Sequence, residues 1–264
     1  MISGILKKMR TELNDTVQYA LHLNEQLYMN DFLGKEIRME WDGRIICGSC
    51  GVQTKKSFGE GFCYNCFVKA PEAAECIIRP ELCRAHIGEG RDVEWELQHH
   101  NVPHIVYLAA SDIVKVGVTR STQIPTRWID QGAAAAIRLA ETPNRFEAGI
   151  LEVVLKSFFS DKTNWQRMLK NEVDQSIDLV QEKWELHDQL PSDLTTYFSE
   201  NDEVISLNYP VLEYPAKVVS LSFDKTAIVA GVLKGIKGQY LIFENGNVFN
   251  IRKHTGYSIE LTSS

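Results

Sequence analysis

Four cysteines form the most specific chemical pattern in this sequence. They occur as two Cys-x-x-Cys pairs, Cys47/Cys50 and Cys63/Cys66, with 12 residues between the pairs. Two thiolates three positions apart on a tight turn can bind one ion, and two such turns complete the tetrahedron that Zn²⁺ prefers. The spacing predicts a zinc-ribbon-like segment with a structural zinc; iron, a redox pair and unmetallated thiols are the alternatives. A closed site of this kind should stabilise the fold and perform no chemistry.

The two remaining cysteines form a second, looser pattern. Cys76, Cys83 and His86 have the spacing Cys-x6-Cys-x2-His, which supplies three ligands for a second metal ion. A fourth ligand would have to come from a later histidine. The candidates are His99, His100 and His104. The alternative is a pair of small buried side chains and a surface histidine, because free cysteines often pack as small apolar residues.

Composition and charge narrow the class of protein. The chain has 264 residues, of which 44% are hydrophobic and 24% charged, as in folded globular proteins. No apolar run approaches the roughly 18 residues of a membrane span, so we expect no membrane partner and a cytoplasmic location. The net charge of -7 is concentrated in residues 171–204, which hold ten acidic residues and one Lys. Residues 105–170 hold nine basic and six acidic residues, so the overall sign does not exclude nucleic acid as a partner.

Hydrophobic periodicity predicts the elements that position these residues. Alternation predicts strands over 17–23 and 37–41, and Asp42-Gly43 is typical of a hairpin turn. A central region follows with two strands, a short helix, a strand and a longer helix. Its expected ranges are 105–109, 115–119, 125–131, 135–141 and 142–158, with Thr142 as N-cap of the last helix and Pro143 at its first position.

Beyond the central region the pattern is first helical and then rich in strands. Thr163 and Gln166 have the form of a capping box, and apolar residues at helical spacing continue to Trp184. After residue 204, Asn245-Gly246 predicts a hairpin. We therefore expect an α+β protein. Its predicted segments are N-terminal β strands (1–46), a cysteine-rich zinc-binding segment (47–103), a β-β-α-β-α core (104–170), an acidic amphipathic helix and linker (171–204), and a β-rich, small barrel-like C-terminal unit (205–264).

The central segment resembles the GIY-YIG nuclease superfamily, whose core has the order β-β-α-β-α. Tyr107 in IVYLA, Gly117 in KVGVT, Arg127 in the next helix and Glu152 in AGILE lie in the order expected of that superfamily. The resemblance covers roughly residues 104–170. The whole chain also resembles an uncharacterised bacterial family, defined only as a domain of unknown function, that couples such a core to a cysteine-rich segment.

The resemblance implies a set of catalytic roles. Tyr107 would help to activate water, Arg127 would hold the phosphate, and Glu152 would bind one divalent ion such as Mg²⁺ or Mn²⁺. These residue types suit phosphodiester hydrolysis, because it needs charge neutralisation, a guanidinium for the phosphate oxygens and a proton acceptor. Tyrosine ionises near pH 10, so we expect Lys115 to lower the pKa of Tyr107. The resemblance also implies an Asn late in the sequence of the core, and Asn164 is the candidate for it.

Each of these residues also has a plainer interpretation. Tyr107 is equally typical of a strand buried in a core, and Arg127 of a surface ion pair. Glu152 can pair with Lys156 one helical turn away, which is an ordinary helix interaction. Further phosphate contacts are expected from basic residues interleaved with aromatic ones. They are Arg120, Arg145, Lys156, Lys162 and Arg167, interleaved with Trp128, Phe146 and Trp165.

The function that the sequence favours is that of a zinc-containing nucleic-acid-binding protein, with DNA or RNA as partner, that acts as a metal-dependent phosphodiester hydrolase. One alternative is a non-catalytic DNA- or RNA-binding module with a degenerate nuclease core. The other is a protein-interaction adaptor that docks partners through its acidic helix or its terminal β units. Fold resemblance alone does not separate these classes, because one fold supports many functions.

Overall fold

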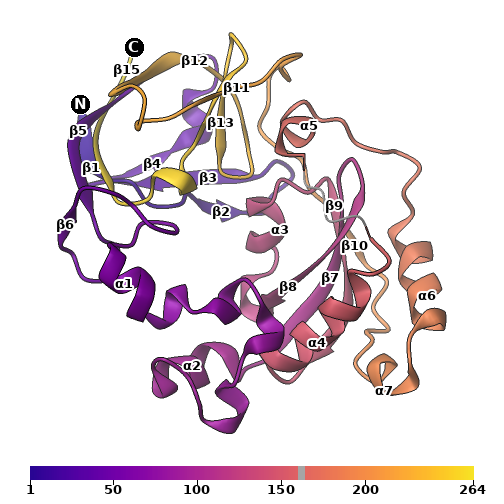
Figure 1. Ribbon diagram of the computed structural model, residues 1–264. Helices are drawn as coiled ribbons and strands as arrows, with labels where there is room; N and C mark the ends of the chain where they lie inside the picture. Colours follow the sequence, from indigo (N-terminus) through magenta and orange to yellow (C-terminus); the bar gives the residue numbers. More distant parts are fainter. Residues whose placement is uncertain (160–163) are drawn as a thin grey trace.

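The computed structural model describes residues 1–159 and 164–264, and these form a mixed α+β protein with several sheets (Figure 1). The largest sheet has eight strands. In spatial order they are β1 (Ile2–Ile5), β15 (Tyr257–Ser263), β5 (Glu36–Ile46), β12 (Ile228–Lys237), β13 (Tyr240–Phe243), β14 (Asn247–Asn250) and β11 (Val219–Leu221), with β6 (Gln53–Thr54) paired to β5. A smaller sheet contains β2 (Arg10–Glu12), β3 (Gln18–His22) and β4 (Gln26–Tyr28).

Strands from the two ends of the chain share the largest sheet. β5 pairs with β15 on one side and with β12 on the other, and β1 pairs with β15. The two termini consequently lie near each other on the same side of the molecule (Figure 1). Segments 1–46 and 205–264 therefore contribute to one sheet and one apolar core.

The prediction of a hairpin turn at Asp42-Gly43 is wrong. β5 continues through these residues, and the pairing with β15 shifts between Ile45 and Trp41, which oppose Tyr257 and Ile259. The extra residues of β5 form a bulge, and Gly43 accommodates it with a φ of 88°. The corresponding prediction at Asn245-Gly246 is confirmed, because this turn joins the antiparallel strands β13 and β14.

The central sheet has four strands in the order β10-β9-β7-β8. Its elements are β7 (His104–Ala110), β8 (Val114–Arg120), α3 (Thr126–Asp130), β9 (Ala135–Thr142), α4 (Arg145–Leu155) and β10 (Val204–Ser206). The order from β7 to α4 is the predicted β-β-α-β-α. β8 is an edge strand of this sheet.

Both faces of β7 are buried, but against different partners. Ile105, Tyr107 and Ala109 join the core that contains α3 and the largest sheet. Val106 and Leu108 face α4 and α6 (Leu179–Gln189) on the other side of the central sheet. Side chains from α3 and α4 can therefore meet only around the open edge at β8.

Two predicted helix starts differ from the structure. α4 is capped by Asn144, whose side chain accepts a hydrogen bond from the Glu147 N–H at 3.0 Å, whereas Thr142 belongs to β9. β9 runs further than its alternation suggested, because Thr142 still pairs with His104 of β7. Thr163, the predicted cap of the next helix, lies outside the described residues, as does Lys162.

The single acidic helix expected up to Trp184 is divided into two helices. α5 (Trp165–Leu169) is capped by Asn164, and α6 has its own cap at Asp178. Asn171, between the two helices, adopts a φ of 56°, which an α-helix does not accommodate. α6 is followed by α7 (Ser192–Thr195), and Leu179 and Leu186 dock α6 on the central core.

The cysteine-rich segment has little regular structure. It contains α1 (Tyr64–Lys69), four 3-10 turns and α2 (Val93–His100). The 3-10 turns are η2 (Pro71–Ala73), η3 (Glu75–Ile77), η4 (Pro80–Leu82) and η5 (Ala85–Ile87), while η1 (Met29–Phe32), η6 (Ser121–Gln123) and η7 (Arg252–His254) lie elsewhere. Within residues 1–159 and 164–264, no helix combines the length and the apolar character needed to cross a membrane.

Candidate functional site

The four predicted zinc ligands converge. The Sγ atoms of Cys47, Cys50, Cys63 and Cys66 all lie within 4.8 Å of one another. Sulfurs in a tetrahedral zinc site with Zn–S bonds of about 2.3 Å are about 3.8 Å apart. The Sγ atoms of Cys50 and Cys63 are 3.8 Å apart, so this cluster fits a metal ion such as zinc.

Backbone contacts of the two cysteine turns explain how the cluster forms. The first turn closes where the Gly51 N–H donates to the Cys47 carbonyl, and the second turn starts α1 with Cys63 as N-cap. The two turns are joined by a hydrogen bond from the Gly48 N–H to the Gly61 carbonyl at 2.8 Å. Burial opposes ionisation of Cys47, but backbone N–H groups outweigh it and lower the pKa of that thiol to about 6. Donors directed at sulfur favour the thiolate, which is the form that binds metal.

The second cysteine pattern also converges, but with a different histidine. Cys76, Cys83 and His100 form a buried group whose ligand atoms lie within 4.8 Å of one another. His86 lies outside this group and its ring stacks on Phe146 with centroids 4.5 Å apart, whereas His100 is one of the three histidines predicted for the fourth position. Sequence spacing favoured His86, but the chain reverses through η4 and η5 and brings the end of α2 back to the two thiols.

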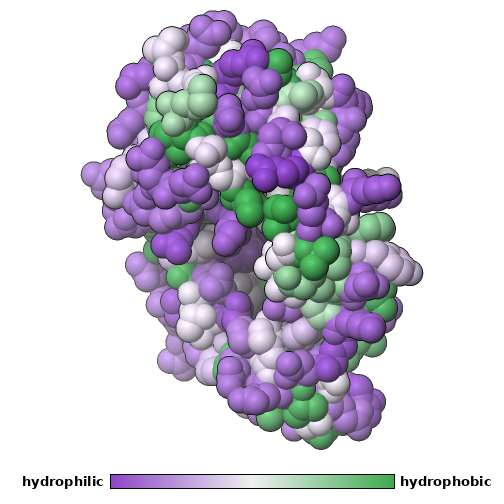
Figure 2. All heavy atoms as spheres, turned by 90° about the vertical axis from the view of Figure 1, so that its left-hand side faces the viewer, coloured by the Kyte–Doolittle hydropathy of each residue, from purple (hydrophilic) through white to green (hydrophobic). Residues whose placement is uncertain are grey.

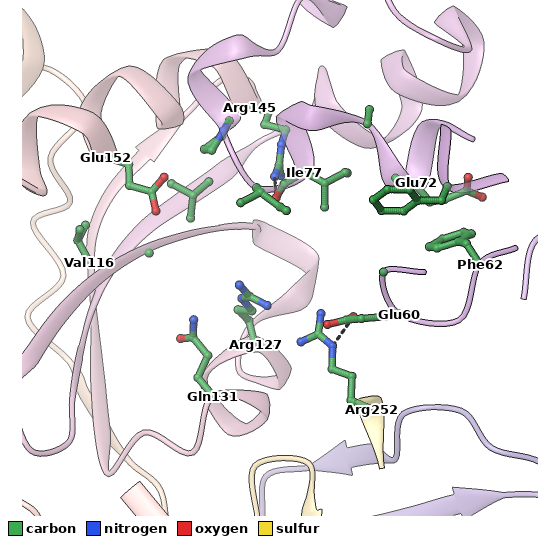
Figure 3. Close-up of a pocket in the computed structure, with 18 residues that line it drawn as sticks. Glu60, Phe62, Glu72, Ile77, Val116, Arg127, Gln131, Arg145, Glu152 and Arg252 are labelled. Carbon is green, nitrogen blue, oxygen red and sulfur yellow. Dashed lines mark hydrogen bonds and ion pairs between the residues drawn. The ribbon is translucent and has the colours of Figure 1, made fainter. Parts of the chain in front are cut away.

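A cavity of about 520 Å³ opens at the edge of the central sheet (Figure 3). Val116 and Gly117 of β8 form its floor, with α4 on one side and α3 on the other. Its charged and polar lining consists of Glu60, Glu72, Arg127, Gln131, Arg145, Glu152 and Arg252. Figure 2 shows the molecule hollowed at mid-height, with hydrophilic side chains on the left of the opening and hydrophobic ones above it and to its right.

Glu152 lines one end of this cavity from α4. Glu152 is 7% exposed, and its Oε2 accepts no hydrogen bond from any described residue. The Lys156 ammonium lies 3.4 Å from that oxygen, which is the helix ion pair expected from the sequence. Burial raises the pKa of Glu152 above its ordinary value of 4.5, and Lys156 opposes this shift. Lys156 offsets part of the cost of burying this carboxylate, and a cation bound in the cavity would offset more of it.

Arg127 and Gln131 lie opposite Glu152, on and just after α3 (Figure 3). Tyr107 is only 1% exposed and does not line the cavity, but its hydroxyl donates to Gln131 Oε1 at 2.8 Å. This bond leaves the amide N–H groups of Gln131 as donors for a ligand. The phenol therefore positions Gln131 and does not reach the cavity.

The expected activation of Tyr107 by Lys115 is not what the structure shows. Burial raises the pKa of Tyr107 above 10, and the cation that opposes this shift is Arg127. Lys115 has its ammonium 3.9 Å from the Asp112 carboxylate, at the start of β8. A phenol with a raised pKa is rarely ionised near neutral pH, so these contacts do not support the predicted role of Tyr107 in activating water.

Gly117 is required by Tyr107. The two residues oppose each other on β8 and β7, and a Cβ at position 117 would lie 2.5 Å from the Tyr107 hydroxyl oxygen. We expect Gly117→Ala to lower the free energy of unfolding by about 1–3 kcal/mol, measured by urea denaturation, because the phenol must shift in a packed core. In a Tyr107→Leu background the same change should cost less, and an equal cost would show that the clash is not the cause.

Arg145 and Arg252 complete the basic lining. Arg145 is fixed by its Nε and Nη2 groups, which donate to the carbonyls of Cys76 and Ile77, both at 2.8 Å. Arg252 comes from η7 beside the largest sheet, and its Nε lies 2.5 Å from Glu60 Oε2. No sequence pattern indicates Arg252, because only the tertiary fold brings η7 to this cavity. The sequence pattern also does not indicate Gln131 as a site residue, because it marks only the end of the short helix expected over 125–131.

The other predicted phosphate contacts do not form one patch. Arg120 lines a smaller adjoining hollow that shares Arg127, Arg145 and Arg252 with the cavity. Arg167 is paired with Glu172 and Asp112 away from it. The interleaved aromatic residues serve packing. Trp128 is buried in the main core, Phe146 lies under His86, and Trp165 stacks on Tyr240.

The comparisons with known proteins establish the family and no activity. No curated protein and no solved structure matches the chain. One family model, described as "Protein of unknown function (DUF2797)", matches residues 34–259. That range contains both cysteine clusters and every residue named above as lining the cavity. The chain belongs to this family of unknown function, and the site must be interpreted from its own geometry.

Proposed function

We propose that the protein binds the sugar-phosphate backbone of DNA or RNA in this cavity and hydrolyses a phosphodiester bond there with Mg²⁺ or Mn²⁺, as a GIY-YIG-like nuclease. The observation that carries the proposal is the placement of Arg127, Arg145 and Arg252 in one open cavity with Glu152. The Arg127 guanidinium, together with the N–H groups of Arg145 and Arg252 that are not bonded to Cys76, Ile77 and Glu60, favours an anionic ligand of several phosphates.

The shape of the basic surface supports an extended ligand. The smaller hollow adjoins the cavity through the three shared arginines and adds Arg120 and Lys8, the latter paired with Asp130 of the same hollow. A single small anion would need only one or two of these side chains. A polymer with regularly spaced phosphates can contact them in succession, and such contacts position a strand without reading its sequence.

The carboxylate of Glu152 fits a divalent cation. Its Oε2 is buried and accepts no hydrogen bond from the described residues, and oxygen ligands are those that Mg²⁺ and Mn²⁺ prefer. The chemistry that such an ion supplies is neutralisation of the charge that develops on the phosphate. Arg127 would hold the phosphate from the opposite side, and Gln131, fixed by Tyr107, would orient the substrate or a water by donation from its amide.

A second candidate function is nucleic-acid binding without cleavage. The burial of Tyr107 favours it, because this superfamily's tyrosine is implied to activate water and here the hydroxyl is bonded to Gln131. In that case the arginines would bind the same backbone, and Glu152 would only pair with Lys156. The two functions predict the same binding and differ in turnover.

Labelled single- and double-stranded DNA and RNA, incubated with the full-length protein, test both functions. We expect salt-sensitive binding and cleavage that requires Mg²⁺ or Mn²⁺ and stops with EDTA. Arg127→Ala should weaken binding about tenfold and reduce its salt dependence, since one phosphate contact is lost. Arg38→Ala is the matched control, because Arg38 is exposed on β5 and paired with Glu40.

The outcomes separate the possibilities. Binding without cleavage under any divalent ion would replace the nuclease by the binding module. Absence of both binding and cleavage would refute the nucleic-acid proposal altogether. Equal losses in Arg127→Ala and Arg38→Ala would show that the charge of the protein, and not this cavity, attracts the nucleic acid.

A further inference from the structure

The buried group of Cys76, Cys83 and His100 lies outside the catalytic proposal and has ligand geometry of its own. All three residues are buried, and their ligand atoms lie within 4.8 Å of one another. His100 directs Nδ1 at the Cys76 sulfur, at a distance of 3.8 Å. A sulfur and a nitrogen bound to the same tetrahedral zinc are about 3.6 Å apart, so only a small adjustment is needed.

Hydrophobic burial does not explain why this segment is ordered. The local core consists of Ala74, Cys76, Cys83 and Ala85, with Phe146 packed against it. Four small side chains bury little apolar surface, and the segment between α1 and α2 consists of short 3-10 turns. Small, irregular segments of this kind are commonly held by a metal ion, whose binding energy is folding energy.

Glu96 supplies an independent indication. It is 3% exposed, its Oε1 accepts a hydrogen bond from the Arg91 N–H at 2.8 Å, and its Oε2 lies 3.7 Å from His100 Nδ1. In the described part of the chain, His100 is its only ion-pair partner. A cation bound beside His100 would stabilise this buried carboxylate, because a buried charge without a counter-charge costs several kcal/mol.

We infer that Cys76, Cys83 and His100 bind a second structural zinc ion, and that the Glu96 carboxylate, which lies 3.7 Å from His100 Nδ1 but outside this three-residue group, shifts toward the ion as the fourth ligand. The four donors are two thiols, one imidazole and one carboxylate, a set that zinc accepts in a closed tetrahedral site. The inference stands apart from the proposed nuclease activity, because it concerns metal content and folding and is independent of any substrate.

This second site would also hold one wall of the cavity. The backbone carbonyls of Cys76 and Ile77 accept hydrogen bonds from the Arg145 guanidinium. On the same wall, α4 packs directly on η4. A Cβ added at Gly149 would lie 2.2 Å from the Glu81 nitrogen. Loss of the ion would therefore loosen the turns that position both Arg145 and the helix carrying Glu152.

Zinc stoichiometry of the full-length protein tests the inference without any variant. Native mass spectrometry after purification with zinc should show two ions per chain, one for each cysteine group. One ion per chain in the wild type would overturn the inference. This measurement does not depend on whether altered proteins fold.

Variants then assign the second ion. Cys83→Ser and His100→Ala should each reduce the content from two ions to one, while His86→Asn, which alters the histidine stacked on Phe146, should retain two. Glu96→Gln should release one ion to a chelator faster than the wild type. Retention of two ions by Cys83→Ser and His100→Ala would refute the site, and an unchanged release rate in Glu96→Gln would refute Glu96 as a ligand.

Cobalt substitution provides a signature that a purely structural defect would not produce. Thiolate-to-cobalt charge-transfer absorption is expected from both sites, with four sulfurs in one and two in the other. Cys83→Ser should lose only the component of the two-sulfur site, and Cys50→Ser only that of the four-sulfur site. A wild-type spectrum that Cys83→Ser leaves unchanged would contradict the proposal.

Discussion

Glu152→Gln should lower phosphodiester cleavage by about a thousandfold, equivalent to about 4 kcal/mol of transition-state stabilisation, while nucleic-acid binding remains close to that of the wild type. The amide has the shape of the carboxylate but no charge with which to hold a divalent ion. The arginines that grip the backbone are unaffected. Single-turnover cleavage and equilibrium binding, measured on the same labelled substrate, separate the two effects.

The same substitution should leave the fold intact or stabilise it. Burial raises the pKa of Glu152 above 4.5, so ionisation of this carboxyl costs stability once the pH exceeds that ordinary value. The advantage of Gln should therefore grow as the pH rises from 4.5 through the raised pKa, and should be absent below 4.5. Urea denaturation at pH 4 and pH 7 measures it.

Glu141→Gln is the matched control for these experiments, because Glu141 is exposed on β9 and does not line the cavity. It should change neither cleavage nor its dependence on divalent ions. Cleavage by Glu152→Gln at the wild-type rate would remove this carboxylate from the mechanism. A large loss of binding together with cleavage would show that the substitution disturbs the cavity itself.

Cys50→Ser should abolish metal binding by the four-cysteine cluster and unfold its two turns. Structural zinc contributes on the order of 10 kcal/mol in small zinc-binding domains, and these turns hold few buried apolar side chains of their own. Hydrogen exchange should show loss of protection in residues 47–70, and metal analysis should show the loss of one ion. Ser49→Ala, in the same turn, should retain the ion.

The effect of Cys50→Ser should extend to the cavity. The segment between the two cysteine turns, residues 51–62, contains Glu60 and Gly61. Glu60 is paired with Arg252, and Gly61 packs against Thr255 with no room for a Cβ. Loss of structure in this segment would release the Arg252 side chain and open one wall of the cavity, so binding of nucleic acid should weaken as well. Unaltered exchange and binding in Cys50→Ser would show that the thiols hold no structural ion.

Local signals in the sequence were sufficient to predict the central elements and the convergence of the first four cysteines. The apolar runs of β7 and β8 mark paired strands, and two Cys-x-x-Cys turns place four sulfurs by geometry within each turn. The prediction of one continuous acidic helix was less accurate. The apolar spacing continues across Asn171, although the backbone there leaves the helical region. Periodicity records which face is apolar and does not record such a break.

The composition of the site depended on contacts that no local pattern contains. His86 has better sequence spacing to Cys83 than His100 has, yet the reversal of the chain through the 3-10 turns decides which imidazole arrives. Arg252 lies on η7, between strands β14 and β15 of the largest sheet, and reaches the cavity only after the strands of both ends have paired. The burial of Tyr107 depends on packing against α3, and the strand pattern alone does not show whether this side chain is buried or exposed.

The meeting of strands from both ends in one sheet has a consequence for biogenesis. A chain emerging from the ribosome presents Arg127 and Glu152 well before Arg252, and β5 must wait for β12 and β15 before its sheet is complete. The pocket therefore stays incomplete until the chain up to Arg252 has been synthesised. If the pocket cuts nucleic acid, this order of synthesis delays cleavage of nearby messenger and ribosomal RNA until that point.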